Sequence, residues 1–77
     1  MNQRQTERQR RIACPELQTP QGIIRTPYVV ELSNGIVERY YPLIKEQPFT
    51  EWTSNRLKLK EDDEGLLTLW DDNKPII

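Results

Sequence analysis

The chain has 77 residues and contains no histidine, one cysteine and three glycines. Without histidine it cannot form a Ser-His-Asp triad, a Cys-His couple or a zinc site that needs imidazole ligands. A lone Cys14 can form neither an internal disulfide nor a metal site built from several thiolates, and we expect it to be an exposed or lightly covered thiol. The three glycines are too widely spaced to cradle a phosphate. We therefore predict no catalytic residue, no metal and no cofactor, and hence no enzyme activity.

Long apolar runs are also absent. No stretch approaches the roughly 18 apolar residues that a membrane-spanning helix needs, and residues 1–11 lack the apolar centre of a secretory signal. At 77 residues the chain has room for one small domain and none for a second lobe. We therefore expect a single-domain cytoplasmic protein with no membrane association.

An excess of charge of one sign is absent as well, because the chain has 11 basic and 12 acidic residues and a net charge of −1. The whole chain therefore has no general attraction to polyanions. Residues 1–11 carry four of the arginines against one glutamate, so the remainder is acidic. Residues 1–22 also have few apolar side chains and contain Pro15 and Pro20, a composition that cannot repay the entropy of ordering. We predict a flexible basic arm over residues 1–22 and one all-β domain over residues 23–77.

The clearest local pattern is Asn34-Gly35 between two β-rich runs, residues 28–33 and 36–41. Asn-Gly favours a two-residue type I′ turn, because both central residues of that turn need positive φ. Such a turn pairs Leu32 with Val37. It also places on one face the side chains that we expect to form the core: Tyr28, Val30, Leu32, Val37 and Tyr41.

This register has one unfavourable feature, since it places Glu31 directly opposite Glu38. Like charges in directly opposed positions destabilise a strand pair. A three-residue loop with Gly35 in a bulge would separate them, but it would also place Glu38 among apolar side chains. The two-residue turn is the favoured prediction.

The rest of the chain consists of short apolar runs separated by turn residues. We predict strands near residues 49–53, 56–60 and 66–70, with Leu57 paired to Leu69, and a short terminal strand over residues 75–77. The predicted fold is an all-β antiparallel meander of five or six short strands, forming a curled sheet or a partly open barrel. One or both of Trp52 and Trp70 are expected to anchor its core.

A sheet of this size has too few apolar residues to cover both of its faces. We therefore predict a non-catalytic β-module that associates with itself or with a protein partner, since exposed aromatic residues dominate such contacts. The residues predicted to make this contact are Val29, Ile36, Tyr40, Trp52 and Trp70.

The alternative function is the binding of single-stranded nucleic acid by basic residues with aromatic side chains beside them. The four consecutive acids at residues 61–64 argue against it, and we interpret them as a solvated turn without the spacing of a calcium loop. The candidate nucleic-acid contacts are Arg8, Arg10, Arg11, Arg56, Lys58 and Lys60.

Residues 30–52 contain Asn34-Gly35 between two strands, then Tyr40-Tyr41-Pro42-Leu43, then Thr50-Glu51-Trp52. This layout resembles short uncharacterised bacterial proteins with the same order of motifs. The resemblance covers about a third of the chain and implies a small all-β bacterial protein. It brings no known activity, ligand or site residue.

Overall fold

The computed structural model describes residues 8–77, which form nine β-strands and no helix. The all-β class is confirmed, but the strands are more numerous than the five or six expected, because several contain only two or three residues. Residues 8–77 thus include no helix that is long and apolar enough to cross a membrane. The strands are β1 (Gln9–Cys14), β2 (Leu17–Thr19), β3 (Gly22–Ile24), β4 (Tyr28–Ser33), β5 (Ile36–Pro42), β6 (Glu51–Trp52), β7 (Leu57–Glu61), β8 (Leu67–Asp71) and β9 (Lys74–Ile76).

The strands form two mixed sheets that do not close into a barrel. One has the order β5-β4-β1-β6 and the other the order β3-β2-β7-β8-β9. The contacts of β1 with β6 and of β2 with β7 are parallel, and the other strand pairs are antiparallel. The predicted meander is correct for β4–β5 and for β7–β8–β9. It is wrong for the whole chain, because β1 lies between β4 and β6.

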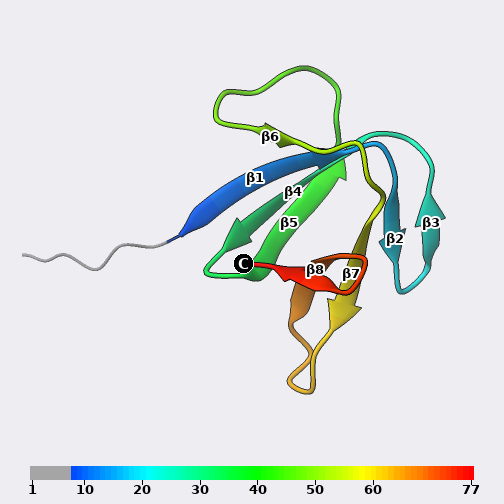
Figure 1. Cartoon of the computed structure of the whole chain (residues 1–77), viewed down its shortest axis with the longest axis vertical. Coiled ribbons are helices and arrows are strands. Elements are labelled where there is room, and N and C mark those ends of the chain that lie inside the picture. Colours follow the sequence, from blue (N-terminus) through cyan, green and yellow to red (C-terminus); the bar gives the residue numbers. More distant parts are fainter. Residues whose placement is uncertain (1–7) are drawn as a thin grey trace, which may run out of the picture.

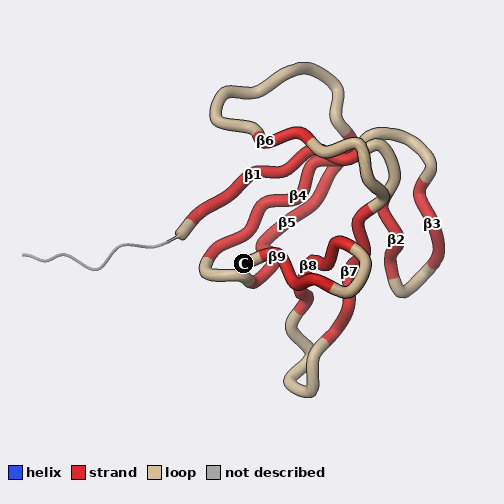
Figure 2. Tube along the Cα trace, in the orientation of Figure 1, coloured by secondary structure: helices blue, strands red, loops and turns tan. Residues whose placement is uncertain are grey.

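Two chain segments pass from the first sheet into the second, side by side (Figures 1 and 2). The first leads from β1 through Pro15 to β2, and the second leads from β6 to β7. The amide of Thr53 donates to the carbonyl of Ala13 at 3.1 Å, and the amide of Leu57 donates to that of Glu16 at 3.1 Å. This parallel pair is a shared corner that fixes how the two sheets face each other.

The prediction of a flexible arm over residues 1–22 is wrong for residues 9–22, and residues 1–7 lie outside the described part of the chain. β1 pairs with β4 along its full length, and β2 pairs with both β3 and β7. Ile12, Cys14 and Leu17 are at most 4% exposed. Few apolar residues are enough here, because these three lie at positions of β1 and β2 whose side chains face the core.

The core lies between the sheets and is made mainly of leucine and valine side chains. Tyr28 and Val37 pack at its margin. Tyr41, which we expected in this core, lies on the other side of the sheet, because the register of β5 shifts before it is reached. The buried core cluster is Ile12, Cys14, Leu17, Val30, Leu32, Leu57, Leu59 and Leu69.

The predicted turn at Asn34-Gly35 is confirmed by φ angles of 53° and 83° and by the pairing of Leu32 with Val37. Beyond that pair β5 contains a bulge, so that Glu31 faces Arg39 in place of Glu38. The bulge replaces a like-charge pair with an ion pair. The expected pairing is therefore right next to the turn and wrong by one residue farther from it.

The second hairpin differs from its expected register by two residues, since Leu59 and not Leu57 lies opposite Leu69. An even shift keeps the same side chains on the inner face, so Leu57 and Leu59 are still buried. The five-residue connection is held by Asp62, whose Oδ1 accepts from the amides of Glu64 and Leu66, both at 2.9 Å.

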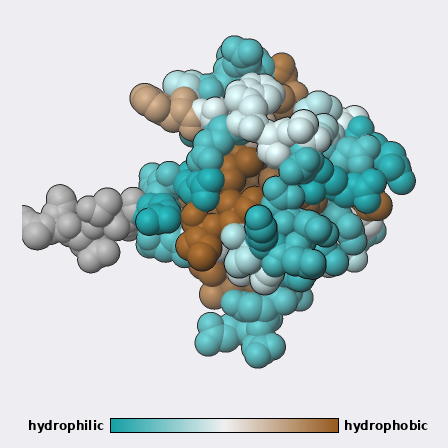
Figure 3. All heavy atoms as spheres, viewed as in Figure 1, coloured by the Kyte–Doolittle hydropathy of each residue, from teal (hydrophilic) through white to brown (hydrophobic). Residues whose placement is uncertain are grey.

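The sandwich is open along the gap between β6 and β9. The side chains at the bottom of this gap are apolar, and Figure 3 shows them as a hydrophobic strip with hydrophilic residues around it. Arg10 bridges the gap, since its guanidinium donates to Glu51 of β6 and, at 2.8 Å, to the carbonyl of Ile77. The apolar lining consists of Ile12, Leu57, Ile76 and Ile77, together with Trp52 and Pro75.

Candidate functional site

Residues 43–50 connect β5 to β6 and lie against the outer face of the four-stranded sheet. We call them the β5–β6 loop. Below the loop, the strand pairings place four side chains in one row across the sheet: Trp52, Ala13, Val29 and Tyr41. Ala13 and Val29 are at most 1% exposed, so other parts of the chain cover them. This face of the sheet is thus largely occupied by the chain itself.

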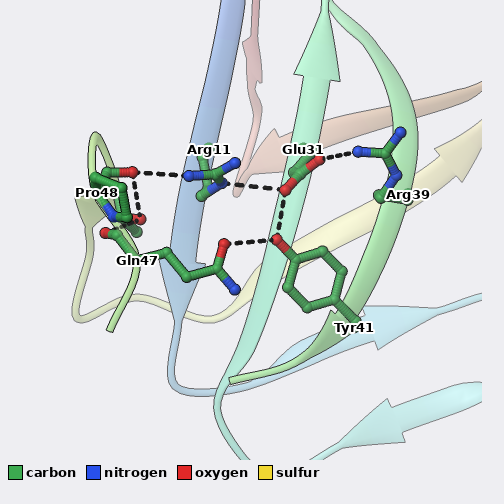
Figure 4. A network of polar contacts seen from close by, with 7 residues as sticks. Arg11, Glu31, Arg39, Tyr41, Gln47 and Pro48 are labelled. Carbon is green, nitrogen blue, oxygen red and sulfur yellow. Dashed lines mark hydrogen bonds and ion pairs between the residues drawn. The ribbon is translucent and has the colours of Figure 1, made fainter. Parts of the chain in front are cut away.

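Beside this row lies an ionic group centred on Glu31, whose side chain is only 13% exposed. The carboxylate accepts from Nε of Arg11 at 3.0 Å, from a guanidinium nitrogen of Arg39 and from the hydroxyl of Tyr41. Figure 4 shows the three donors converging on it from β1 and β5. We call these four residues the Glu31 cluster.

The Glu31 cluster also holds the β5–β6 loop (Figure 4). Nη1 of Arg11 donates to the carbonyl of Pro48 at 2.7 Å, and the hydroxyl of Tyr41 lies 3.1 Å from Oε1 of Gln47. Within the loop, the hydroxyl of Thr50 donates to the carbonyl of Gln47 at 2.8 Å. The loop is therefore fixed at Pro48 by a charge-assisted bond, which is stronger than a neutral one.

These contacts perturb the titration of the cluster. The hydroxyl of Tyr41, and then the guanidinium groups of Arg11 and Arg39, hold the pKa of Glu31 below its usual value. Burial, and then the neighbouring Glu31 carboxylate, raise the pKa of Tyr41. Each shift favours the charged carboxylate beside the neutral phenol. Every group in the cluster is satisfied by a neighbour, so its role is to position the loop.

The β5–β6 loop and the strand that follows it carry three large apolar side chains on the surface. Ile44 is 88% exposed, Phe49 is 95% exposed and Trp52 is 58% exposed. Three such residues within nine positions are a concentration that folding does not require, since their burial contributes little to stability.

Phe49 follows Pro48 in a turn and has a φ of +58°, which is rare for a bulky residue. A non-glycine residue in this conformation destabilises the fold by about 1–3 kcal/mol, and it persists where neighbouring structure imposes it. Here the imposing contacts are those on Pro48 and Gln47, on the N-terminal side of Phe49. The loop therefore holds an exposed aromatic ring in a conformation that is unfavourable in isolation.

A hollow of about 400 Å³ lies next to Phe49 on the uncovered part of the same sheet face. Its polar lining combines charges of both signs with one amide. A partner side chain placed there would contact the Phe49 ring and a charged group together. The lining residues are Gln9, Arg10, Arg11, Glu31, Leu32, Glu38, Arg39 and Phe49.

The five residues predicted to contact a protein partner do not form one patch. Trp52 is exposed, but Val29 is fully buried and cannot touch a partner. Ile36 is partly buried. Tyr40 lies on the opposite face of β5 from Tyr41, and its ring centroid is 6.3 Å from that of Tyr28. Trp70 belongs to the other sheet.

The six predicted nucleic-acid contacts are divided between the two sheets. Arg10 and Arg11 belong to the first sheet and are already paired with Glu51 and Glu31. Arg8 precedes β1, where its backbone bonds the turn residue Asn34.

The other three candidates lie on β7 or just before it, where Arg56 is paired with Glu16. Lys60 lies over the ring of Trp70, with Nζ 4.1 Å from the ring centroid. Neither Trp52, which is exposed, nor Trp70, which is half-buried, is the core anchor that we expected.

Sequence reasoning missed Phe49, which was assigned to a strand, and Ile44, which was not among the predicted contact residues. The sequence does contain a signal, since the apolar residues here are flanked by Pro48 and by polar residues, with no alternation that could bury them. The expectation of an exposed Cys14 is also wrong. Its thiol is buried in the core, and burial raises its pKa to about 11.

Within residues 8–77 no three histidine, cysteine or acidic side chains are grouped so that they could hold a metal ion. Comparisons of the chain with family models, with curated proteins and with solved structures found no match. The resemblance to short bacterial proteins therefore remains a prediction, and any function must be inferred from the geometry above.

Proposed function

We propose that this chain is a non-catalytic docking module that contacts a protein through the β5–β6 loop, with Phe49 as the central anchor and Ile44 and Trp52 beside it. The observation that carries the proposal is the 95% exposure of Phe49 at a φ of +58°. A strained and exposed aromatic residue destabilises the free protein. It is understandable where a bound partner covers the ring.

The anchoring contacts support the same function. A loop that is ordered before binding loses less conformational entropy when the partner arrives. The Glu31 cluster supplies that order from beneath, through Arg11 and Tyr41. Aromatic residues with few rotatable bonds are also the commonest hot spots of protein interfaces.

The partner surface must offer an apolar recess for Phe49 and polar groups around it. Such a partner is either a second copy of this chain or another protein of the same compartment. We place the module in a bacterial cytoplasm, in line with the resemblance and with a single thiol that is buried and unpaired.

Photo-crosslinking tests the proposal directly. A benzophenone amino acid at position 49 should give a discrete adduct in the cells that produce the protein, because the benzophenone ring would lie at the interface. The same amino acid at position 23 is the control, since Ile23 is a surface apolar residue at 39% exposure on the other sheet. An adduct of twice the chain mass would identify self-association.

The proposal fails if position 49 gives no discrete adduct, or if positions 49 and 23 give the same adducts. Trp52→Asp supplies a second arm, because a charge at the edge of the interface should remove the position 49 adduct. Circular dichroism of that variant checks that the fold is unchanged.

A further inference from the structure

The outer face of the five-stranded sheet carries a second group of side chains that the docking loop does not use. Strand pairing aligns Gln18, Lys58, Trp70 and Pro75 in one row across β2, β7, β8 and β9. Their chain neighbours on β2, β7 and β8 are core leucines, so the row faces away from the core. The half-buried Trp70 is the largest side chain in the row.

The Trp70 ring is held in place on this face. Its indole N–H donates to the hydroxyl of Thr68 at 2.9 Å, and the ammonium of Lys60 lies 4.1 Å from the ring centroid. The hydrogen bond fixes one edge of the ring. The Lys60 ammonium that lies over the ring is the end of a flexible side chain, which can move away.

The two lysines on this face differ from the arginines of the molecule. Arg10, Arg11, Arg25, Arg39 and Arg56 each form an ion pair with a glutamate. Among the described residues, neither Lys58 nor Lys60 is paired with a carboxylate. This strip therefore presents two positive charges that no carboxylate of residues 8–77 neutralises, beside the aromatic ring of Trp70.

Acidic turns limit the strip at both ends. Residues 61–64 follow Lys60, and Asp71 and Asp72 follow Trp70, with Asp71 bonded to the side chain of Asn55 at 3.2 Å. These acids repel a long polyanion and leave room for a short one. Lys58 and Lys60 are separated by about 7 Å along the strand, a distance that one extended nucleotide step spans.

We propose that Lys58, Lys60 and Trp70 bind a short segment of single-stranded nucleic acid. One base stacks on the ring of Trp70, and the phosphates on either side of it pair with the two lysines. The ammonium of Lys60 exchanges its contact with the ring for a phosphate. Stacking on a base is stronger than an exposed cation–π contact, so the exchange is favourable. A duplex does not fit, because its bases are already stacked.

Fluorescence titration tests this site. In Trp52→Phe protein, Trp70 is the one remaining tryptophan, and an oligothymidylate of about eight nucleotides should quench it to saturation. Two phosphate contacts to a single strand predict that log K falls with log salt with a slope of about −1.4. The double variant Lys58→Ala, Lys60→Ala should weaken binding at least tenfold and reduce the slope toward zero.

Matched variants separate this site from general attraction to cations. Lys45→Ala removes one exposed lysine from the β5–β6 loop and should change binding less than twofold. Trp70→Phe, followed by the anisotropy of a labelled oligonucleotide, should weaken binding less than Trp70→Ala, because a smaller ring still stacks.

Four results would overturn the proposal. These are no saturable quenching at low salt, a loss in Lys45→Ala as large as in the double lysine variant, equal binding of a duplex, and equal binding of an acidic peptide. Both lysines are only half-buried and lie outside the core, so their variants remain informative if Trp70→Ala fails to fold.

Discussion

At the scale of single residues, Phe49 is the position where sequence and conformation disagree most. Asn34 and Asp72 also have positive φ, but each lies in a two-residue turn of a hairpin and is of a type that tolerates this conformation. Phe49 also lies in a turn, after Pro48, but a bulky aromatic residue is not of a type that tolerates positive φ. Such strain tends to gather at functional sites, and this is why we assign the ring to binding.

The strain at position 49 predicts an unusual stability effect. Phe49→Asn should make the protein more stable than Phe49→Ala by about 0.5–1 kcal/mol, because asparagine accepts positive φ and alanine does not. Neither change loses a buried contact, since the ring is almost fully exposed. Urea denaturation of the two variants measures the difference. Equal midpoints would mean that the backbone at this position is not strained.

Glu31 has a different role, since its ion pairs with Arg11 and Arg39 stabilise the fold. Glu31→Gln should lower the free energy of unfolding by about 1–2 kcal/mol, because the guanidinium and hydroxyl donors around it lose a charged acceptor. Urea denaturation at neutral pH checks the value. Glu46→Gln, which removes an exposed carboxylate from the β5–β6 loop, is the control and should change stability by less than about 0.5 kcal/mol.

The same variant has a predicted pH dependence. The folded state lowers the pKa of Glu31 below its ordinary value of 4.5. In the same way, the hydrogen bond from Arg10 to Glu51 lowers the pKa of Glu51. The stabilisation is therefore present above the unfolded pKa and is lost as pH falls through the folded pKa values. Stability should fall below about pH 4.5, and less steeply in Glu31→Gln. Parallel curves for the two proteins would contradict the assignment.

At the scale of elements, the bulge in β5 resolves a conflict that is visible in the sequence. Glu38 is the extra residue, and the alternation of inward and outward side chains continues from Val37 to Arg39 as if it were absent. The bulge thus keeps Val37 facing inward and places Arg39 opposite Glu31.

Two single-residue deletions test this interpretation. Deleting Glu38 should leave a regular ladder with the same pairs, and should cost less than about 1 kcal/mol. Deleting Arg39 should give an equally regular ladder with Glu38 opposite Glu31, and should be the less stable of the two. Thermal unfolding measures both. If the deletion of Glu38 were the more harmful, the bulge would have a role other than charge pairing.

The elements that the sequence predicts well are those whose signals are local. Asn34-Gly35 is sufficient to define its turn, and the leucines at positions 57 and 59 define the inner face of β7. Register away from the turns was wrong, because it depends on one extra residue in β5 and on the length of the turn around Asp62.

β1 and β2 were missed because their support comes from strands far away in the sequence. Their polar composition predicts disorder when only local residues are considered. In the fold, Arg10 and Arg11 meet glutamates from β6 and β4, so the charges that indicated an arm become ion pairs. The candidate site was found only in part for a similar reason, since the exposure of Phe49 depends on how the β5–β6 loop is tied to the sheet.

At the scale of the whole molecule, β1 stabilises both sheets. It pairs with β4 and β6 in the first sheet, and the shared corner connects it to β2 in the second. Cys14 lies at the end of β1 and is 2% exposed. Its thiol should therefore react with a disulfide reagent at pH 8 only when the molecule opens. We expect labelling to be slow in native buffer and to accelerate in urea together with the loss of tryptophan fluorescence. Rapid native labelling would contradict a core that includes β1.

The central claim is that Phe49 is held exposed and ordered before any partner arrives, and NMR relaxation of the free protein tests it most directly. We predict backbone order parameters of about 0.85 for residues 47–50, equal to those of β4 and β5. The Glu31→Gln variant should lower them, because the cluster supplies the order. Values below about 0.6 in the unmodified protein would contradict the claim, since a mobile loop would present no fixed docking surface.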